Sequence, residues 1–212
     1  MKAALLATPK FKGLAEVKRI LELRGWSLSE KNPDFVITLG GDGSVLYAES
    51  KHPGVPIIAL NAGELGFLAC NEVEMLEEVL KAVEKGKFVL DKREKLEFTI
   101  GKEKKEALNE VLVTSSVAGK ALRLGIRVGG QPLGFFVCDG VLLSTPTGST
   151  GYNLSCGGPV IEPGTGVYAI TLISPHLSQL KALVVSDRHE TEVTFARQNP
   201  GITVVADGHG SL

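Results

Sequence analysis

The sequence predicts an α/β N-terminal domain with a parallel sheet over residues 1–91, followed by a mostly antiparallel all-β domain over residues 92–212. Two observations support this division. In the first part, short apolar runs alternate with amphipathic segments at helical spacing, as in a parallel sheet covered by helices. In the second part, short segments of period-two alternation follow one another with turn residues between them, as in antiparallel strands.

The elements of the first part follow from apolar spacing and from glycine stops. Apolar runs predict buried strands, and apolar stripes at helical spacing predict helices. Gly86 follows the last stripe and is expected to end that helix. In chain order, the predicted elements are a strand at 2–7, a helix at 13–24, a strand at 35–39, a short helix at 44–50, a strand at 55–61 and a helix at 73–86.

The second part contains many short strands and a single short helix. The segment "LRLGIRV" at 122–128 alternates over four apolar positions, and the turn sequence "GGQP" follows it. The charged runs "KREKLE" and "GKEKKE" are expected to form a solvated strand edge. The predicted strands lie at 95–100, 108–113, 122–128, 168–174, 183–186, 191–195 and 202–206, with a strand, turn and strand over 133–145 and a helix over 150–156.

Composition excludes several classes of function. The net charge is −1 over 212 residues, which argues against nucleic acid as a partner. The chain shows no N-terminal signal pattern and no apolar run long enough to span a bilayer, so no membrane association is expected. The three cysteines form no zinc pattern and are expected to be reduced and mostly in the core, which favours a cytoplasmic location.

The loop Gly40–Gly43 raises the first question of chemistry, because it follows a buried strand and precedes a helix. Ligands of open α/β sheets bind outside the carboxyl ends of the strands, where glycine N–H groups approach anions closely. Asp42 would repel a phosphate, so it is expected to accept a proton from a hydroxyl or to hold a metal ion that bridges phosphates. The alternative is a simple Asp-Gly turn. The loop matches neither the Walker A nor the dinucleotide pattern.

Two further features carry polar side chains. Residues 138–163 contain several hydroxyls and glycines before a short helix, a plausible site for phosphate or ribose or else an elaborate strand-to-helix turn. Asn109 and Glu110 interrupt an apolar strand. These two side chains either face solvent or clamp ribose hydroxyls or an adenine edge.

Together, these three motifs resemble the NAD kinase family. The loop Gly40–Gly43 is shared with lipid kinases and phosphofructokinases, whereas the segment Thr145–Thr150 is highly specific. The matching motifs keep the family order over most of the chain, and three more segments resemble the family at Leu60–Ala69, Ser174–His176 and Val204–His209.

The resemblance implies a Rossmann-like, phosphofructokinase-like first domain and an NAD kinase activity. Such an enzyme transfers a phosphoryl group from ATP or polyphosphate to the 2′-hydroxyl of the adenosine ribose of NAD, giving NADP. Asp42 would be the general base, and Mg²⁺ or another divalent metal would be held mainly through the donor phosphates. A homodimer or homotetramer is also implied. The residues implied to bind substrate or nucleotide are Gly41, Asp42, Gly43, Asn61, Phe67, Leu68, Asn109, Glu110, Lys120, Asp139, Thr147, Ser149, Thr150, Gly151, Tyr152, Asn153, Ser155 and His209.

Some positions depart from the family pattern. Gly151 stands where relatives usually have Ala, Asn153 stands where they have Ser, and His209 stands where Gln is usual. The role given to Lys120 passes to Arg123 if loop lengths differ. Relatives also continue well past the Asp-Gly-Gln region, so a short version or a truncated chain is expected.

Three other functions compete with this interpretation. A lipid kinase would share the Gly-Gly-Asp-Gly loop but has no use for the segment at 145–150. A non-catalytic nucleotide sensor would be expected to lack the base, and Asp42 is present. A purely structural α/β protein leaves both glycine-rich loops unexplained.

Overall fold

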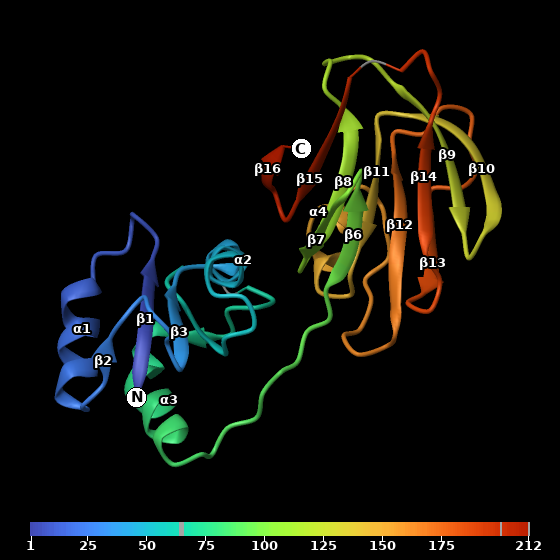
Figure 1. Ribbon diagram of the computed structural model, residues 1–212. Helices are drawn as coiled ribbons and strands as arrows, with labels where there is room; N and C mark the ends of the chain where they lie inside the picture. The colour runs from blue at the N-terminus through green and yellow to red at the C-terminus, as the bar shows by residue number, and fades with distance from the viewer. Residues whose placement is uncertain (64–65, 200, 212) are drawn as a thin grey trace. The chain divides into compact units, whose positions relative to one another are not determined.

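The computed structural model describes residues 1–63, 66–199 and 201–211 (Figure 1). The chain forms two compact units, Met1–Asp91 and Lys92–Leu212. Each unit has its own sheets and its own hydrophobic core. An α/β unit with a parallel sheet precedes a unit of antiparallel sheets, which confirms the predicted fold class.

The first unit is built on a parallel sheet in the order β2-β1-β3-β4-β5. Leu39 at the end of β3 pairs with Ala7 on one side and with Leu60 on the other. The carboxyl ends of these three strands therefore meet at one edge of the sheet, and the Gly40–Gly43 loop starts there. The strand bounds are β1 (Lys2–Ala7), β2 (Ser27–Leu28), β3 (Phe35–Leu39), β4 (Ile57–Asn61) and β5 (Asn71–Glu72).

Helices cover both faces of this sheet. One face packs against α1 (Leu14–Leu23) and α3 (Leu76–Glu84) through the buried residues of their apolar stripes. On the other face, Ala48 of α2 (Asp42–Lys51) packs against Val36. A 3-10 turn at Val73–Met75 leads into α3. Helix α2 begins at Asp42, two residues earlier than predicted, so the carboxylate belongs to the first helical turn.

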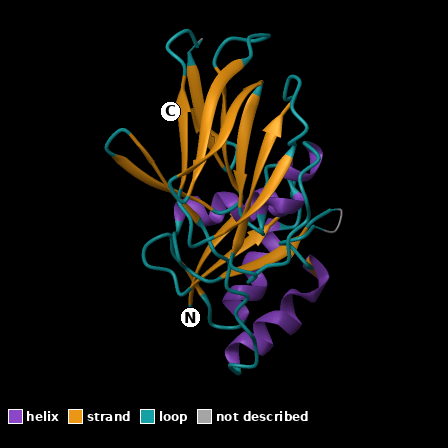
Figure 2. Cartoon of the chain, turned by 90° about the vertical axis from the view of Figure 1, so that its right-hand side faces the viewer, coloured by secondary structure: helices purple, strands orange, loops and turns teal. Residues whose placement is uncertain are grey.

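The second unit consists of antiparallel sheets with strands side by side (Figure 2). A six-stranded sheet has the order β13-β12-β11-β8-β15-β16, a three-stranded sheet has the order β10-β9-β14, and β6 pairs with β7. The bounds are β6 (Leu96–Ile100), β7 (Glu103–Ala107), β8 (Glu110–Ser115), β9 (Leu122–Val128), β10 (Gln131–Cys138), β11 (Gly140–Ser144), β12 (Val167–Ile173), β13 (Ala182–Ser186), β14 (Thr191–Phe195), β15 (Ile202–Ala206) and β16 (His209–Ser211).

The core of the second unit combines residues from its two larger sheets. Val141 and Ile170 of the six-stranded sheet belong to one buried cluster with Leu122, Leu124 and Ile126 of β9. The alternation seen in the sequence at 122–128 therefore marks the buried side of a strand, as predicted. Burial of apolar side chains of this size contributes roughly 1.5–3 kcal/mol each.

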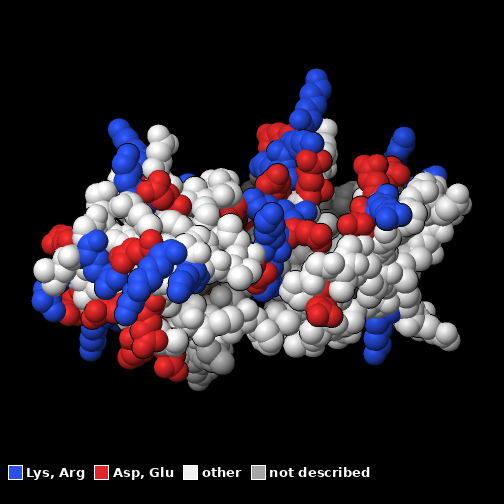
Figure 3. All heavy atoms as spheres, turned by 90° about the horizontal axis from the view of Figure 1, so that it is seen from below, with Lys and Arg blue, Asp and Glu red and all other residues white. Residues whose placement is uncertain are grey.

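Charged side chains cover the β6–β7 hairpin. Lys104 lies 2.6 Å from Glu97, and Lys95 lies 3.1 Å from Glu106. Strand β7 falls on the charged run "GKEKKE", which was expected to form a solvated strand edge, and its charged side chains are mostly exposed. On the face shown in Figure 3, basic and acidic side chains are interspersed. No helix within the described residues is long and apolar enough to cross a membrane.

Side-chain burial separates the three cysteines. Cys138 is buried, as the sequence predicts, and Cys156 is half-buried. Cys70 is exposed, contrary to the expectation that the cysteines lie mostly in the core. It follows the loop at the end of β4, and its Sγ donates to the carbonyl oxygen of Phe67 (3.6 Å).

Candidate active site

Asp42 is fixed at the carboxyl edge of the parallel sheet by backbone hydrogen bonds. Oδ1 accepts the N–H groups of Leu68 (2.9 Å) and Ala69 (3.1 Å), and Oδ2 accepts the N–H of Phe67 (2.9 Å). An ionised carboxylate offers about four lone-pair positions. Oδ2 carries only one of these three bonds, so it retains capacity to accept a further hydrogen. The carboxylate is thereby oriented before any ligand arrives.

Asn61 ties the end of β4 to the same loop. Its Nδ2 donates to the carbonyl oxygen of Ala69 (3.3 Å), and its Oδ1 accepts the N–H of Gly63 (2.8 Å). The Asn61 side chain is buried, whereas the Phe67 side chain is 64% exposed. Of the predicted residues in the first unit, Asn61, Phe67 and Leu68 thus meet Asp42 in one loop cluster, and Gly41 and Gly43 flank it in sequence.

Gly66 lies against the Asp42 carboxylate. A Cβ at position 66 would stand 2.1 Å from Asp42 Oδ1, whereas a Cβ at Gly63 would meet nothing within 4 Å. Gly66→Ala is therefore expected to displace the carboxylate and to slow any reaction in which Asp42 takes part about tenfold or more, since misplacement by about 1 Å can cost about 10²-fold. Gly63→Ala is the matched control and is expected to keep activity within about twofold. Equal activity of the two variants would contradict this role for Gly66.

A second cluster lies at the start of β8. Asn109 Oδ1 and Glu110 Oε2 are buried and have no hydrogen-bond partner in the described part of the chain. Leaving a buried polar atom unpaired costs about 1–3 kcal/mol. Such atoms persist where a ligand supplies the missing partner or where the site stores strain. They are therefore the polar groups of this unit best placed to contact a ligand.

The segment Thr145–Gly148 packs closely against the start of β8. Thr145 Oγ1 donates to the carbonyl oxygen of Leu108 (2.6 Å), and the Thr145 N–H donates to the carbonyl oxygen of Asn109 (2.9 Å). A Cβ at Gly148 would lie 2.2 Å from that same oxygen of Asn109. Only glycine allows the two backbones to approach this closely.

The other hydroxyls of this segment serve the loop itself. Ser149 Oγ donates to the carbonyl oxygen of Pro146 (2.7 Å), and Thr150 Oγ1 donates to that of Thr147 (3.4 Å). Thr147 is buried, and its Oγ1 accepts from Arg93 Nη1 (3.5 Å). These hydroxyls, which the sequence suggested as donors to a ligand, form hydrogen bonds within the protein that stabilise the conformation of the loop.

Asn153 is fully buried and fully engaged within the protein. Its Oδ1 accepts the hydroxyl of Thr171 (2.6 Å), and its Nδ2 donates to the carbonyl oxygens of Ser149 (3.1 Å) and Pro159 (2.9 Å). The amide joins the loop to β12. Helix α4 (Tyr152–Ser155) is a single turn after a 3-10 turn at Gly148–Thr150, shorter than the predicted helix at 150–156.

Several predicted residues surround this cluster at the surface. Burial raises the pKa of Tyr152, and the nearby Cys156 and Asp139 raise it further, which places all three in one neighbourhood. Gly151 and Ser155 are exposed at the two ends of α4. His209 begins β16, but its side chain lies outside the part that the structure describes.

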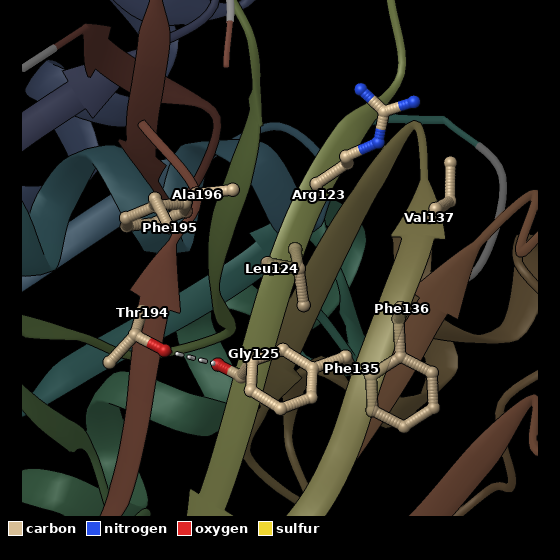
Figure 4. A pocket seen from close by; sticks show the side chains of 9 residues that line it. All are labelled: Arg123, Leu124, Gly125, Phe135, Phe136, Val137, Thr194, Phe195 and Ala196. Atoms are coloured by element: carbon tan, nitrogen blue, oxygen red, sulfur yellow. Dashed lines mark hydrogen bonds between the residues drawn. The ribbon is translucent and has the colours of Figure 1, made fainter. Parts of the chain in front are cut away.

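Lys120 and Arg123 lie in different surroundings. Lys120 is exposed in the turn after β8, where its N–H donates to the carbonyl oxygen of Val117 (3.2 Å). Arg123 lines a pocket of about 300 Å³ on the three-stranded sheet, together with residues that include Phe135 and Thr194 (Figure 4). The Arg123 N–H is held by Asn199 Oδ1 (2.7 Å).

Sequence reasoning missed one residue that organises this cluster. The Asp207 carboxylate accepts the N–H groups of Leu108 (2.7 Å), Asn109 (2.6 Å) and Glu110 (3.2 Å). The signal in the sequence was "ADG", an Asp-Gly pair after an apolar strand, which predicts a hairpin turn. This local pattern does not tell from which distant N–H groups the carboxylate accepts hydrogen bonds.

The electrostatics of Glu110 are unusual for a carboxylic acid. Burial and, as the smaller cause, the negative charge of Asp207 together raise the pKa of Glu110 to about 7. Both effects disfavour the ionised form. Near neutral pH, Glu110 is therefore distributed between a form that donates and a form that only accepts hydrogen bonds.

This pKa has a consequence for stability. Between about pH 4.5 and 7, the folded chain holds a proton on Glu110 that the unfolded chain has released, so stability falls as pH rises through this window. Glu110→Gln removes the titration and is expected to raise the free energy of unfolding at pH 8 by on the order of 1–3 kcal/mol. Urea unfolding at pH 5 and pH 8 measures the effect, with Glu106→Gln on the exposed strand β7 as control. The same pH dependence in all three proteins would contradict this assignment.

The fold and the two loop clusters place the chain in a class of proteins with an α/β unit followed by a β unit. Residues 15–88 match the ATP-NAD kinase N-terminal domain, and residues 108–212 match the ATP-NAD kinase C-terminal domain. The crystal structure of an NAD kinase from Archaeoglobus fulgidus in complex with ATP is 30% identical, has a TM-score of 0.84, and aligns over 100% of this chain and 86% of its own. The chain belongs to the NAD kinase family.

Curated relatives agree with this assignment. The NAD kinase of Borrelia garinii subsp. bavariensis is 35% identical over 182 residues, 81% of this chain and 65% of its own length. The NAD kinase of Caldanaerobacter subterraneus subsp. tengcongensis is 36% identical over 182 residues, 82% of this chain and 64% of its own. The chain thus spans a little under two thirds of these relatives. Yeast NADH kinase complexed with NADH, at 21% identity and a TM-score of 0.86 over 98% of this chain and 73% of its own, supports the fold.

Proposed function

We propose that this chain is an NAD kinase that phosphorylates the 2′-hydroxyl of the adenosine ribose of NAD and releases NADP. The observation that carries the proposal is the state of Asp42. Its carboxylate is oriented by three backbone N–H groups at the carboxyl edge of a parallel sheet, and Oδ2 can still accept a hydrogen. Similarity to NAD kinases over most of the chain supports the same activity.

Asp42 acts as the general base in this proposal. The 2′-hydroxyl donates its hydrogen to the Asp42 carboxylate while its oxygen forms a bond to the γ-phosphorus of the donor. The bond from that phosphorus to the leaving phosphate oxygen breaks, and the donor leaves as ADP or as a polyphosphate shortened by one unit. A carboxylate is a weak base, but the transition state of phosphoryl transfer is loose and the proton can leave late.

Asn109 and Glu110 bind NAD in this proposal. Their buried, unpartnered oxygens accept hydrogens from ribose hydroxyls or from the amino group of adenine. Tyr152, Asp139 and Gly151 lie near them at the surface and border the bound nucleotide. Thr147, Ser149, Thr150 and Asn153 shape the loop, because their side chains already have partners within the protein. Phe67, Leu68, Ser155, Lys120 and His209 remain predicted contacts.

A divalent metal ion is assigned to the donor phosphates. The described residues hold no group of three or more His, Cys, Asp or Glu side chains arranged to bind a metal ion. Within Gly40–Gly43, the acidic side chain is that of Asp42. When bound, Mg²⁺ neutralises charge on the transferring phosphoryl group. ATP is the donor favoured by the Archaeoglobus complex, with polyphosphate as the alternative.

The assembly and location belong to the same proposal. A homodimer or homotetramer in the cytoplasm fits the family. The interspersed charges visible in Figure 3 give no extended basic surface on that face for nucleic acid.

The donor is tested by supplying NAD and Mg²⁺ with either ATP or polyphosphate and by following NADP with an NADP-specific dehydrogenase. We expect NADP to form with ATP. Formation with polyphosphate alone would replace ATP as the donor and leave the acceptor chemistry unchanged. Consumption of ATP without NADP would contradict the proposed function.

A further inference from the structure

Asp207 lies in the two-residue turn that joins β15 to β16. Asp207 and Gly208 both have positive φ, 51° and 68°, and Ala206 pairs with His209 across the turn. Tight hairpin turns of this kind favour Asn-Gly and Asp-Gly, because these residues tolerate the left-handed conformation. An asparagine at position 207 would form the same turn, so the turn itself does not require a charged side chain.

The turn is fastened to the start of β8. Three consecutive N–H groups, those of Leu108, Asn109 and Glu110, donate to the Asp207 carboxylate. In return, the Asp207 N–H donates to the carbonyl oxygen of Glu110 (3.0 Å). Hydrogen bonds to a charged acceptor are about twice as strong as neutral ones. These four bonds fix the backbone from which the Asn109 and Glu110 side chains project.

That backbone carries the unpartnered polar atoms of the second unit. Asn109 Oδ1 and Glu110 Oε2 are buried without a partner, and only a rigid support keeps such atoms aimed in one direction. Asp42 is held in the first unit by the same number of N–H groups, but there the carboxylate is the group proposed to react. The Asp207 carboxylate instead holds the backbone in place, and the side chains of Asn109 and Glu110 are the groups proposed to contact the ligand.

We propose that Asp207 is a positioning residue that holds Asn109 and Glu110 in the geometry in which they bind NAD. This inference rests on the proposed function. Asp207 acts through the segment it holds, and its negative charge adds to the effect of burial in raising the pKa of Glu110. The titratable groups that face Glu110, among the described side chains, are Asp207 from the β15–β16 turn and Cys156 after α4.

The variant Asp207→Asn tests the hydrogen bonds to the start of β8 separately from the formation of the β15–β16 turn. Asparagine keeps the turn and one acceptor oxygen, but it loses the charge and leaves one N–H group without its acceptor. We expect the KM for NAD, and the Kd for NAD measured without donor, to rise about 5- to 100-fold, the equivalent of a lost charged hydrogen bond. The kcat at saturating NAD is expected to stay within about threefold. Asp187→Asn removes the same charge from an exposed turn of the same unit and is the matched control.

A pH titration supplies a readout that a merely structural role would not move. The pKa of the Glu110 carboxyl, followed by carbon-13 NMR of the protein alone and assigned with Glu110→Gln, is expected to fall in Asp207→Asn. The sign follows from the loss of a neighbouring negative charge. The pH at which NAD affinity is half-maximal is expected to move down with it. Asp187→Asn is expected to change neither value.

The outcomes distinguish this inference from the proposed function. If wild type binds NAD and Asp207→Asn binds it equally well, with the Glu110 titration unmoved, the positioning role is wrong and the proposed function stands. If Asp207→Asn loses kcat with an unchanged KM, the role is also wrong. If wild type fails to bind NAD at all, the proposed function is wrong, and this inference falls with it.

Discussion

Asp42→Asn is expected to lower the kcat for NADP formation by roughly 10²–10⁴-fold, the usual contribution of a general base. NAD affinity is expected to stay within about threefold, because the substituted group acts on the proton rather than on the bulk of the ligand. The amide oxygen can replace Oδ1 and keep the N–H groups of Leu68 and Ala69, while the amide nitrogen faces the N–H of Phe67. The expected cost in stability is therefore about one hydrogen bond, roughly 1 kcal/mol.

The control for this variant lies on the same helix. Glu49 is an acid of α2 whose Oε1 accepts the N–H of Gly54 (3.1 Å), so Glu49→Gln changes a comparable hydrogen bond away from the loop cluster. It is expected to keep kcat within about twofold. Initial rates at saturating NAD and calorimetric NAD binding measure both quantities. A kcat for Asp42→Asn within tenfold of wild type would show that another group takes the proton.

Gly148→Ala is expected to have the second largest effect. The added Cβ would lie 2.2 Å from the carbonyl oxygen of Asn109 and 2.7 Å from its Cα, and backbone atoms cannot yield as a flexible side chain does. Overpacking of this kind typically costs about 1–3 kcal/mol or somewhat more. The start of β8 is displaced as a result, so NAD binding is expected to weaken at least tenfold even where the chain still folds.

Gly151→Ala is the matched control three residues further on. A Cβ there would meet its nearest atom, the carbonyl oxygen of Gly148, at 3.4 Å, and Asn109 Nδ2 at 3.9 Å. The added methyl group therefore has room, and stability is expected to stay close to that of wild type. Thermal unfolding of the two variants tests the difference. A Gly148→Ala protein as stable as Gly151→Ala would contradict the close packing of residues 145–148 on β8.

The sequence predicted the parts of the fold that depend on local pattern. The strands at 2–7, 35–39 and 122–128 were found as expected, because apolar runs and period-two alternation are local properties. The shortest strands were missed, such as β5, which has only two residues. The charged run that forms β7 was expected at a strand edge, but its charges hide the period that would give its bounds. The start of α2 was placed two residues late, because periodicity cannot locate the first turn of a helix.

The sequence identified the segments that form the candidate site, but it predicted the role of each side chain in those segments less well. The importance of Asp42 was visible from the glycines around it, but not its three N–H donors from 67–69, which lie 25 to 27 residues away. Hydroxyls such as that of Ser149 were expected to face a ligand, and the structure gives them to the loop. Asp207 was missed because its partners at Leu108–Glu110 are 97 to 99 residues distant, and no local pattern encodes such a contact.

The most direct measurement is NADP formation by wild type and Asp42→Asn side by side, with NAD binding measured on the same samples. NAD, Mg²⁺ and ATP are supplied, and the product is read with an NADP-specific dehydrogenase, so only 2′-phosphorylated NAD is counted. If Asp42 is the base of an NAD kinase, wild type makes NADP, and the variant binds NAD but is slower by orders of magnitude. If wild type binds NAD and makes no NADP with ATP or with polyphosphate, this chain does not phosphorylate NAD.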